Sequence, residues 1–214
     1  RDMLRFINFI DHLSTYTGKA FGWLILVLTL AVTYEVFVRY ALKDPTAWAF
    51  DIAYIMYGAM FMMAGAYTLS RDGHVRGDVI YRLWPPKVQA WIELCLFFVF
   101  FFPGILALIY SGIVYAAESW AYRPFGPAGV VGEIAINSPA GIPVSPLKTL
   151  LPLAAFMALL QGLAELARCV VCIRTGVWPA RLKDVEELDI ALEHKEELLQ
   201  ASEAIMHGHL GEKR

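Results

Sequence analysis

Four long segments with almost no charged residues decide what this 214-residue chain can fold into. The hydrocarbon core of a bilayer is about 30 Å thick, and a helix needs about 20 residues to cross it. Segments at about 20–40, 46–69, 88–117 and 147–171 meet that length. Charged residues make up only 18% of the chain, against about a quarter of a soluble domain, and the mean hydropathy is +0.52. The sequence therefore predicts an all-α membrane protein with four transmembrane helices.

The fourth segment has the shortest uncharged centre, from Thr149 to Ala164. Glu165 and Arg168 follow close to its end. We expect both side chains to reach the headgroup region by snorkelling, with their aliphatic stems lying along apolar surface.

Lysine and arginine are distributed unevenly about these spans. Cytoplasmic segments retain positive charge. Of the 18 basic residues, 14 lie before the first span, between spans two and three, or in the C-terminal region. The other two loops hold four, namely Arg39, Lys43, Arg123 and Lys148. Both termini are therefore predicted to be cytoplasmic, in an up-down four-helix arrangement joined by loops.

The residues before the first span form a separate predicted element. Residues 1–18 carry Leu4, Ile7, Ile10 and Leu13 at helical spacing, beside charged residues. This pattern predicts an amphipathic helix lying in the cytoplasmic interface. We expect no cleavable signal peptide, because the first apolar segment is too long for one.

Two more segments flank or interrupt the predicted transmembrane domain, residues 19–174. The loop 118–146 is rich in proline and glycine, so it is predicted to be irregular and to face outward. Residues 179–207 are acidic, with apolar positions at alternating spacings of three and four, which predicts a cytoplasmic amphipathic helix. That helix either is solvated or skims the membrane, or it binds a partner helix or a second copy of the chain.

The predicted depth of the charged residues bears on transport. Ionisable residues near the bilayer midplane are costly and mark ion or proton paths. Glu35, Arg39 and Asp51 are predicted to be neighbours at the outer interface, and none of the acidic residues in the spans is placed at mid-depth. The sequence therefore predicts no central relay. The three residues are expected to fix helix depth and packing; the alternatives are an outward-facing cation site and contact with a partner.

Several kinds of chemistry are excluded by the positions of particular residue types. All five histidines lie outside the predicted spans, so no pair within the bundle can ligate a haem. Cys169 and Cys172 form a lone C-x-x-C without the second pair that a structural zinc site needs. No nucleophile elbow, P-loop or dinucleotide fingerprint is present. We expect no enzyme activity, no cofactor, no metal site and, with a net charge of −2, no nucleic-acid partner.

Spans two and three carry features suited to helix packing. Span three contains a run of phenylalanines, including Phe98, Phe101 and Phe102, directly before Pro103. This run faces lipid or packs on a neighbouring subunit, and the proline is expected to bend the helix. In span two, small residues around Gly58 and Gly65 permit close helix approach.

An ordered set of these features resembles a known family. The set consists of Glu35 and Arg39, Trp48 and Asp51, Gly58 and Gly65, the stretch 71–78 with His74, Arg76 and Asp78, Pro85-Pro86, Gly141-Ile142-Pro143 and Gln161-Gly162. Together these residues resemble the small membrane subunit, the DctQ-like Q subunit, of tripartite ATP-independent periplasmic (TRAP) transporters. The resemblance covers about residues 5–174. It departs at Gly77, where the family pattern has an apolar β-branched residue.

The resemblance implies that the chain functions in the assembly of a transporter complex. Such systems couple a sodium gradient to uptake of organic acids across the bacterial inner (cytoplasmic) membrane. A periplasmic binding protein captures the substrate, a large many-spanning subunit moves it, and the small subunit braces the large one. The candidate partner contacts are then Glu35, Arg39, Trp48, Asp51, Gly58, Gly65, His74, Arg76, Asp78, Phe98, Phe101 and Phe102. The candidate docking residues for the binding protein are Arg123, Phe125, Glu133 and Asn137.

The sequence also allows other interpretations of the stretch 71–78 and of the chain as a whole. The stretch 71–78 either fixes spans two and three or is a polar turn with basic residues near lipid phosphates. The chain as a whole could instead be a self-sufficient four-helix carrier, which would need a charge such as Glu35 facing a shared cavity. A third possibility is an anchoring subunit of another membrane complex.

Overall fold

The computed structural model describes residues 2–71, 81, 83–122, 132–182 and 195. The chain divides into two units, Arg1–Ala180 and Arg181–Arg214, and every helix discussed below belongs to the first. Almost all of the acidic helix predicted at 179–207 lies outside the described residues.

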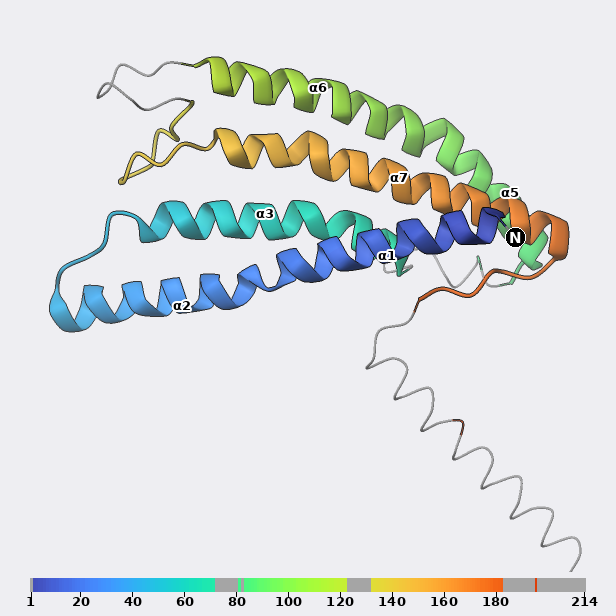
Figure 1. The fold of residues 1–214 in the computed structure, drawn as a ribbon, viewed down its shortest axis with the longest axis horizontal. Helices are drawn as coiled ribbons and strands as arrows, with labels where there is room; N and C mark the ends of the chain where they lie inside the picture. Colours follow the sequence, from blue (N-terminus) through green and yellow to red (C-terminus); the bar gives the residue numbers. More distant parts are fainter. Residues whose placement is uncertain (1, 72–80, 82, 123–131, 183–194, 196–214) are drawn as a thin grey trace, which may run out of the picture. The chain divides into compact units, whose positions relative to one another are not determined.

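Helices make up most of the described part of the first unit. Their bounds are α1 Asp2–Gly22, α2 Leu24–Phe37, the π-helical η1 Val38–Leu42, α3 Ala49–Ser70, α5 Pro86–Leu96, the π-helical η2 Phe97–Phe101, α6 Phe102–Ala121 and α7 Ser145–Thr175. Successive long segments run in opposite directions along the bundle (Figure 1).

Four continuous helical segments are long and apolar enough to cross a membrane. They are Met3–Leu42, Ala49–Ser70, Pro86–Ala121 and Ser145–Thr175. Across the described ranges the structure contains one isolated β-bridge, between Ile134 and Pro143, and no strand. The predicted all-helical architecture, with four helices long and apolar enough to span a membrane, is therefore confirmed. The side on which the termini lie stays a prediction.

The N-terminal helix runs further than the segment 1–18 that the sequence pattern marks out. α1 continues to Gly22, and only Trp23 separates it from α2. It packs against α3 and α7 and buries Ile7 and Ile10. One face of α1 thus belongs to the bundle, while its position in the membrane interface stays a prediction.

α7 is the central helix of the bundle. It contacts α1, α3, α5 and α6, and it lies between α6 and α3 (Figure 1). Half of its most apolar stretch is buried, compared with 11–22% for the other three spans. Because neighbouring helices shield it from lipid, α7 tolerates polar residues that would be costly on a lipid-facing surface. This shielding explains how the fourth span can cross the bundle although its uncharged centre is the shortest of the four.

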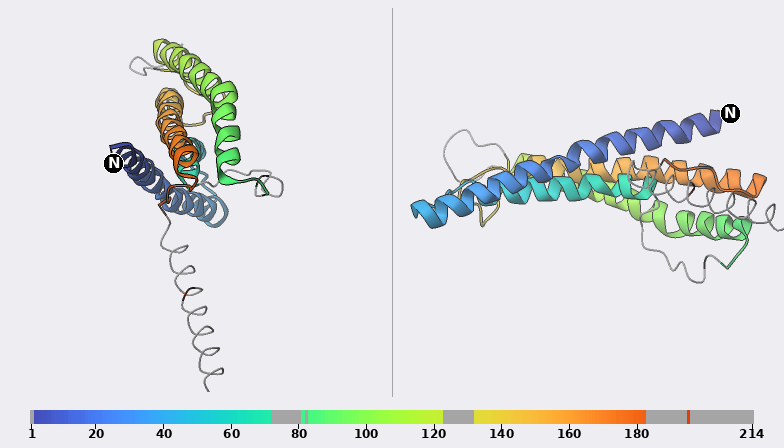
Figure 2. Two further views of the ribbon diagram at one scale, coloured as in Figure 1. Left: turned by 90° about the vertical axis from the view of Figure 1, so that its right-hand side faces the viewer. Right: turned by 90° about the horizontal axis from the view of Figure 1, so that it is seen from below.

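The proline in span three bends the helix, as predicted. Pro103 has no backbone N–H, and its ring displaces the carbonyl one turn earlier. The residues directly before α6 form the π-helical turn η2, which absorbs the disrupted hydrogen bonding. α5 and α6 therefore meet at a clear angle (Figure 2).

Two small apolar clusters hold α7 against its neighbours. One joins α3 to α7 through Met63, Ala66, Ala154 and Met157. The other joins α5 to α7 through Ala90, Cys169 and Cys172. Cys169 and Cys172 are therefore buried in the contact between α5 and α7.

Candidate functional site

Five of the most enclosed polar residues in the described chain lie between α1 and α7. We call Asp11, Ser14, Gln161, Glu165 and Arg168 the buried polar cluster; each is at most 1% exposed. Asp11 and Ser14 are three positions apart on α1, and the other three recur along one face of α7. Both sets of side chains therefore meet across one helix–helix contact.

Hydrogen bonds connect the whole cluster. The guanidinium of Arg168 forms ion pairs with the carboxylates of both Asp11 and Glu165. Gln161 Nε2 donates to Asp11 Oδ1 at 2.9 Å and to Glu165 Oε1 at 3.4 Å. Ser14 Oγ donates to Gln161 Oε1 at 2.8 Å. The cluster ties α1 to α7 through fully enclosed, charge-assisted contacts.

The snorkelling predicted for Glu165 and Arg168 is wrong. Both side chains are fully buried, and Arg168 turns inward to Asp11 instead of outward to the headgroups. The reason is the N-terminal helix, which supplies a second carboxylate for the guanidinium. Within the described residues, Arg168 Nε is buried and makes no hydrogen bond. A buried charge is tolerated when it is paired in this way.

The charged and amide groups of the buried polar cluster are engaged with one another. Its two carboxylates are engaged by one guanidinium and one amide. In the part of the chain that the structure describes, no group of three or more histidine, cysteine, aspartate or glutamate side chains is arranged to hold a metal ion. What the cluster does is fix the relative position of two helices.

A second polar cluster anchors the loop between α6 and α7. Asp51, near the start of α3, is buried, and its Oδ2 accepts hydrogen bonds from Ser138 Oγ at 2.6 Å and from the Ala140 N–H at 3.1 Å. Ser138 Oγ in turn accepts from the N–H groups of Gly141 and Ile142, at 2.9 and 3.2 Å. One carboxylate therefore holds the turn at residues 138–142 against the end of α3.

The same loop is fastened at its other end to α6 and α7. Ser145 Oγ accepts from the Glu133 N–H at 2.9 Å and donates to the Ser119 carbonyl at 3.1 Å. The Glu133 carboxylate pairs with Lys148, whose Nζ lies 4.0 Å from the centroid of the Tyr115 ring. The hydrogen bond from Lys148 lowers the pKa of Glu133 below its usual value. Residues 132–146 thus form a fixed structure at this end of the bundle.

Glu35 and Arg39 form the predicted pair at the end of the first span. Arg39 Nε donates to Glu35 Oε1 at 2.9 Å, and Glu35 Oε2 accepts from the Thr46 N–H at 3.0 Å. Glu35 therefore closes the turn into α3, while Asp51 bonds to the loop at 138–142 and not to this pair. Trp48, in the same turn, stacks on Tyr34 with ring centroids 5.9 Å apart.

The predicted small-residue face of α3 divides into two parts. A Cβ on Gly58 would lie 3.1 Å from Leu147 Cδ1, so Gly58 packs on α7 of the same chain. A Cβ on Gly65 would meet nothing within 4 Å, so this position faces open space.

The phenylalanines of span three differ in whether they pack within the chain or face outward. Phe101 packs on Gly162 so closely that no side chain fits there. Phe98, with 56% of its surface exposed, faces outward, and Phe102 forms ring contacts with Phe97, Phe98 and Phe101.

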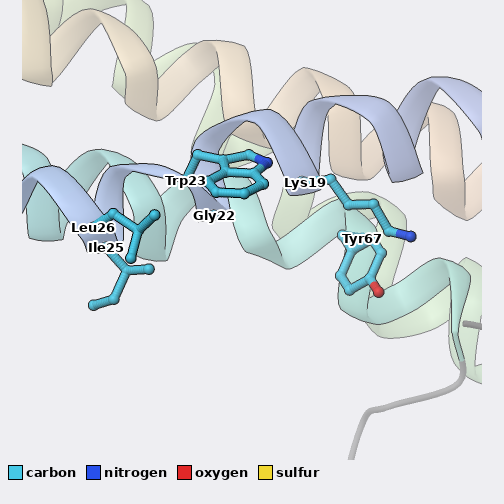
Figure 3. Close-up of a pocket in the computed structure, with 7 residues that line it drawn as sticks. Lys19, Gly22, Trp23, Ile25, Leu26 and Tyr67 are labelled. Atoms are coloured by element: carbon cyan, nitrogen blue, oxygen red, sulfur yellow. The ribbon is translucent and has the colours of Figure 1, made fainter. Parts of the chain in front are cut away.

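Sequence reasoning missed the crossing point of α1 and α3. At Gly18 a Cβ would lie 2.5 Å from Tyr67 Cβ. Beside this contact is a groove of about 490 Å³ lined by residues that include Lys19 and Trp23 from the first span and Tyr67 from α3 (Figure 3). The spacing of Gly18 and Gly22 was a usable signal for close helix approach.

Five of the predicted site residues lie outside the described residues. They are His74, Arg76 and Asp78 in the predicted cytoplasmic loop, and Arg123 and Phe125 in the predicted outward loop. Of the other docking candidates, Asn137 is exposed and Glu133 is held by Lys148.

The fold and these contacts define a class, a four-helix membrane protein whose enclosed polar groups join its own helices. The family model for the DctQ component of tripartite ATP-independent periplasmic transporters matches residues 28–172. The chain therefore belongs to this family, the small component of TRAP transporters, which is a transporter component and not an enzyme family. No curated protein matches the chain.

Proposed function

We propose that the chain is the non-catalytic small permease subunit of a sodium-coupled, binding-protein-dependent transporter for organic acids. It braces the large many-spanning subunit in the bacterial inner membrane, with both termini in the cytoplasm, and it helps to dock the periplasmic binding protein. Membership of the DctQ family supports the role of small component. The distribution of basic residues supports the orientation.

The observation that carries the bracing role is the use of the buried charges. Asp11, Glu165 and Arg168 bond to one another across α1 and α7. The charged residues that line the groove beside Trp23 and the two cavities between α3, α6 and α7 are Lys19 and the mutually paired Glu133 and Lys148. The three buried charges line none of these spaces. A carrier needs charged groups that face a cavity open to its cargo. Asp11, Glu165 and Arg168 instead hold two helices of the chain together, which supports a role as a fixed support.

Outward-facing apolar surface supports contact with a larger membrane subunit. α2 buries none of its residues and exposes large side chains such as Leu30, at 71%. Phe98 on η2 is exposed as well. Such surfaces face either lipid or another membrane protein, and the family places a large subunit beside the DctQ component.

The anchored loop supports docking of a soluble partner. Residues 132–146 are held by Asp51, Ser145 and Lys148. Ile136 at the loop is fully exposed, and Asn137 beside it is exposed too. A fixed loop that presents an apolar and an amide side chain loses little conformational entropy on binding.

Co-purification tests this proposal. A tagged chain extracted in mild detergent from its native membrane should bring down the large subunit. Phe98→Ala should lower the recovery of that subunit. Phe100→Ala is the control and should not lower it, although Phe100 is 69% exposed against 56% for Phe98 and lies on a different side of the helix. Recovery of the wild-type chain alone would contradict the bracing role. Recovery with the subunits of a different membrane complex would favour the anchoring alternative.

A further inference from the structure

A continuous groove runs along the surface of α7 between α3 and α6. Two cavities of about 480 and 420 Å³ share Phe61, Met62 and Leu151 among their lining residues. Because α7 separates α6 from α3 (Figure 1), its residues form the floor, while α3 and α6 form the walls. We call this feature the α3–α6 groove.

The groove changes from polar to apolar along its length. At the loop end its lining includes the Lys148–Glu133 ion pair and Tyr115. At the other end it is lined by small and aliphatic residues such as Gly65 and Ala158. An amphiphile with a charged head and an apolar tail matches this gradient.

The groove ends within the span. The lining runs from Leu147 to Ala158 on α7 and from Tyr54 to Thr68 on α3, which at 1.5 Å per residue is about 17 Å and about 21 Å, shorter than a hydrocarbon core about 30 Å thick. One turn further along α7, Phe101 packs on Gly162, and neither residue is part of the lining. A transmembrane helix of a partner would need a groove that runs the full thickness of about 30 Å. One leaflet's acyl chain fits the observed length.

We propose that the α3–α6 groove binds a zwitterionic phospholipid of the phosphatidylethanolamine class. The headgroup phosphate lies against Lys148 and its ammonium against Glu133, since each charge then meets its opposite. An acyl chain lies over Leu151, Ala158 and Gly65. The bound lipid fills surface that the helices leave open, and it adds to the attachment of α6 to the rest of the bundle.

Native mass spectrometry of the purified full-length chain tests the proposal, in complex with its partners if they co-purify. Gly65→Leu fills the groove without a clash, because nothing lies within 4 Å of its Cβ position. Gly104→Leu is the matched control, since that position is equally open and lies outside the groove lining. We expect one retained phosphatidylethanolamine on the wild type and on Gly104→Leu. Gly65→Leu should lower the retained fraction about tenfold, which corresponds to about 1.4 kcal/mol.

Headgroup variants and lipid competition complete the test. Lys148→Gln should lower retention, and phosphatidylglycerol supplied in excess should displace the zwitterionic lipid poorly. Unchanged retention in Gly65→Leu, or in Ala158→Leu if the first variant does not fold, would overturn the proposal. Preferred retention of phosphatidylglycerol would overturn the headgroup assignment, and loss of the large subunit with the lipid retained would assign the groove to a partner helix. Lipid retention is measured on the chain itself, so its failure is distinct from a failure to co-purify with a large subunit.

Discussion

The guanidinium of Arg168 lies between the carboxylates of Asp11 and Glu165 and bonds to both, in a part of the bundle without solvent access. This arrangement fixes the N-terminal helix α1 against α7. The ion pairs are stabilising only as a set, because removing one partner leaves an uncompensated buried charge.

Arg168→Met should therefore be strongly destabilising. The buried carboxylates of Asp11 and Glu165 would both lose the guanidinium that bonds to them, at a cost of about 3–5 kcal/mol. The thermal unfolding midpoint of the purified protein measures this effect. Arg174→Met, at an exposed position at the end of α7, serves as the matched control and should change little.

A double-mutant cycle separates the contribution of the Arg168 charge from that of the packing of its side chain. In an Asp11→Asn, Glu165→Gln background, Arg168→Met should cost far less than in the wild type, because no buried carboxylate is left unpaired. Equal costs in both backgrounds would show that the methylene stem of Arg168, and not its charge, holds α1 to α7.

Gly18 is predicted to tolerate no side chain. Its Cβ would lie 2.5 Å from Tyr67 Cβ, so Gly18→Ala must separate α1 from α3 at a cost of about 1–3 kcal/mol. Gly22→Ala is the control, because nothing lies within 4 Å of its Cβ position and alanine favours helix by up to about 1 kcal/mol. Chemical or thermal unfolding of the two variants should shift in opposite directions. A stable Gly18→Ala variant would contradict the close crossing.

How far the sequence predicts this fold depends on the type of signal. Apolar length predicts the four spans because the bilayer requires it, and Pro103 predicts the bend in span three because its ring breaks the hydrogen-bond ladder. The pair Glu35–Arg39 follows from local helical spacing. These features depend on residues near one another in the chain.

The buried polar cluster depends on contacts between residues about 150 positions apart, which spacing within one helix does not reveal. The polar face of α7 is visible in the sequence as Gln161, Glu165 and Arg168, but its partner on α1 is not. Similarly, Asp51 pairs with a loop far along the chain, and the sequence placed it only at the correct end of the bundle.

Asp51 should control the order of the loop before α7. Replacing it with alanine removes the acceptor for Ser138 Oγ and the Ala140 N–H. Amide hydrogen exchange should rise sharply across residues 138–142, while α7 stays protected. Asp44→Ala, at an exposed aspartate in the preceding turn, is the control. Unchanged exchange in Asp51→Ala would show that the loop is held by other contacts.

The loop should also respond to acid through Glu133. Its pKa is lowered in the folded protein, chiefly by the hydrogen bond from Lys148. Its contribution is therefore present above the ordinary glutamate pKa of 4.5 and is lost as the pH falls through the lower folded value. Exchange or proteolysis within residues 132–146 should increase in that acidic range. Glu133→Gln should show the weaker attachment at neutral pH and less dependence on pH below it.

A small subunit that braces its partner supports transport without carrying the substrate. This is measured directly by sodium-driven uptake of labelled organic acid into proteoliposomes that contain either the chain alone or the chain with its large subunit and binding protein. We expect no uptake with the chain alone and uptake with the complete system. Sodium-dependent uptake by the chain alone would contradict the bracing role.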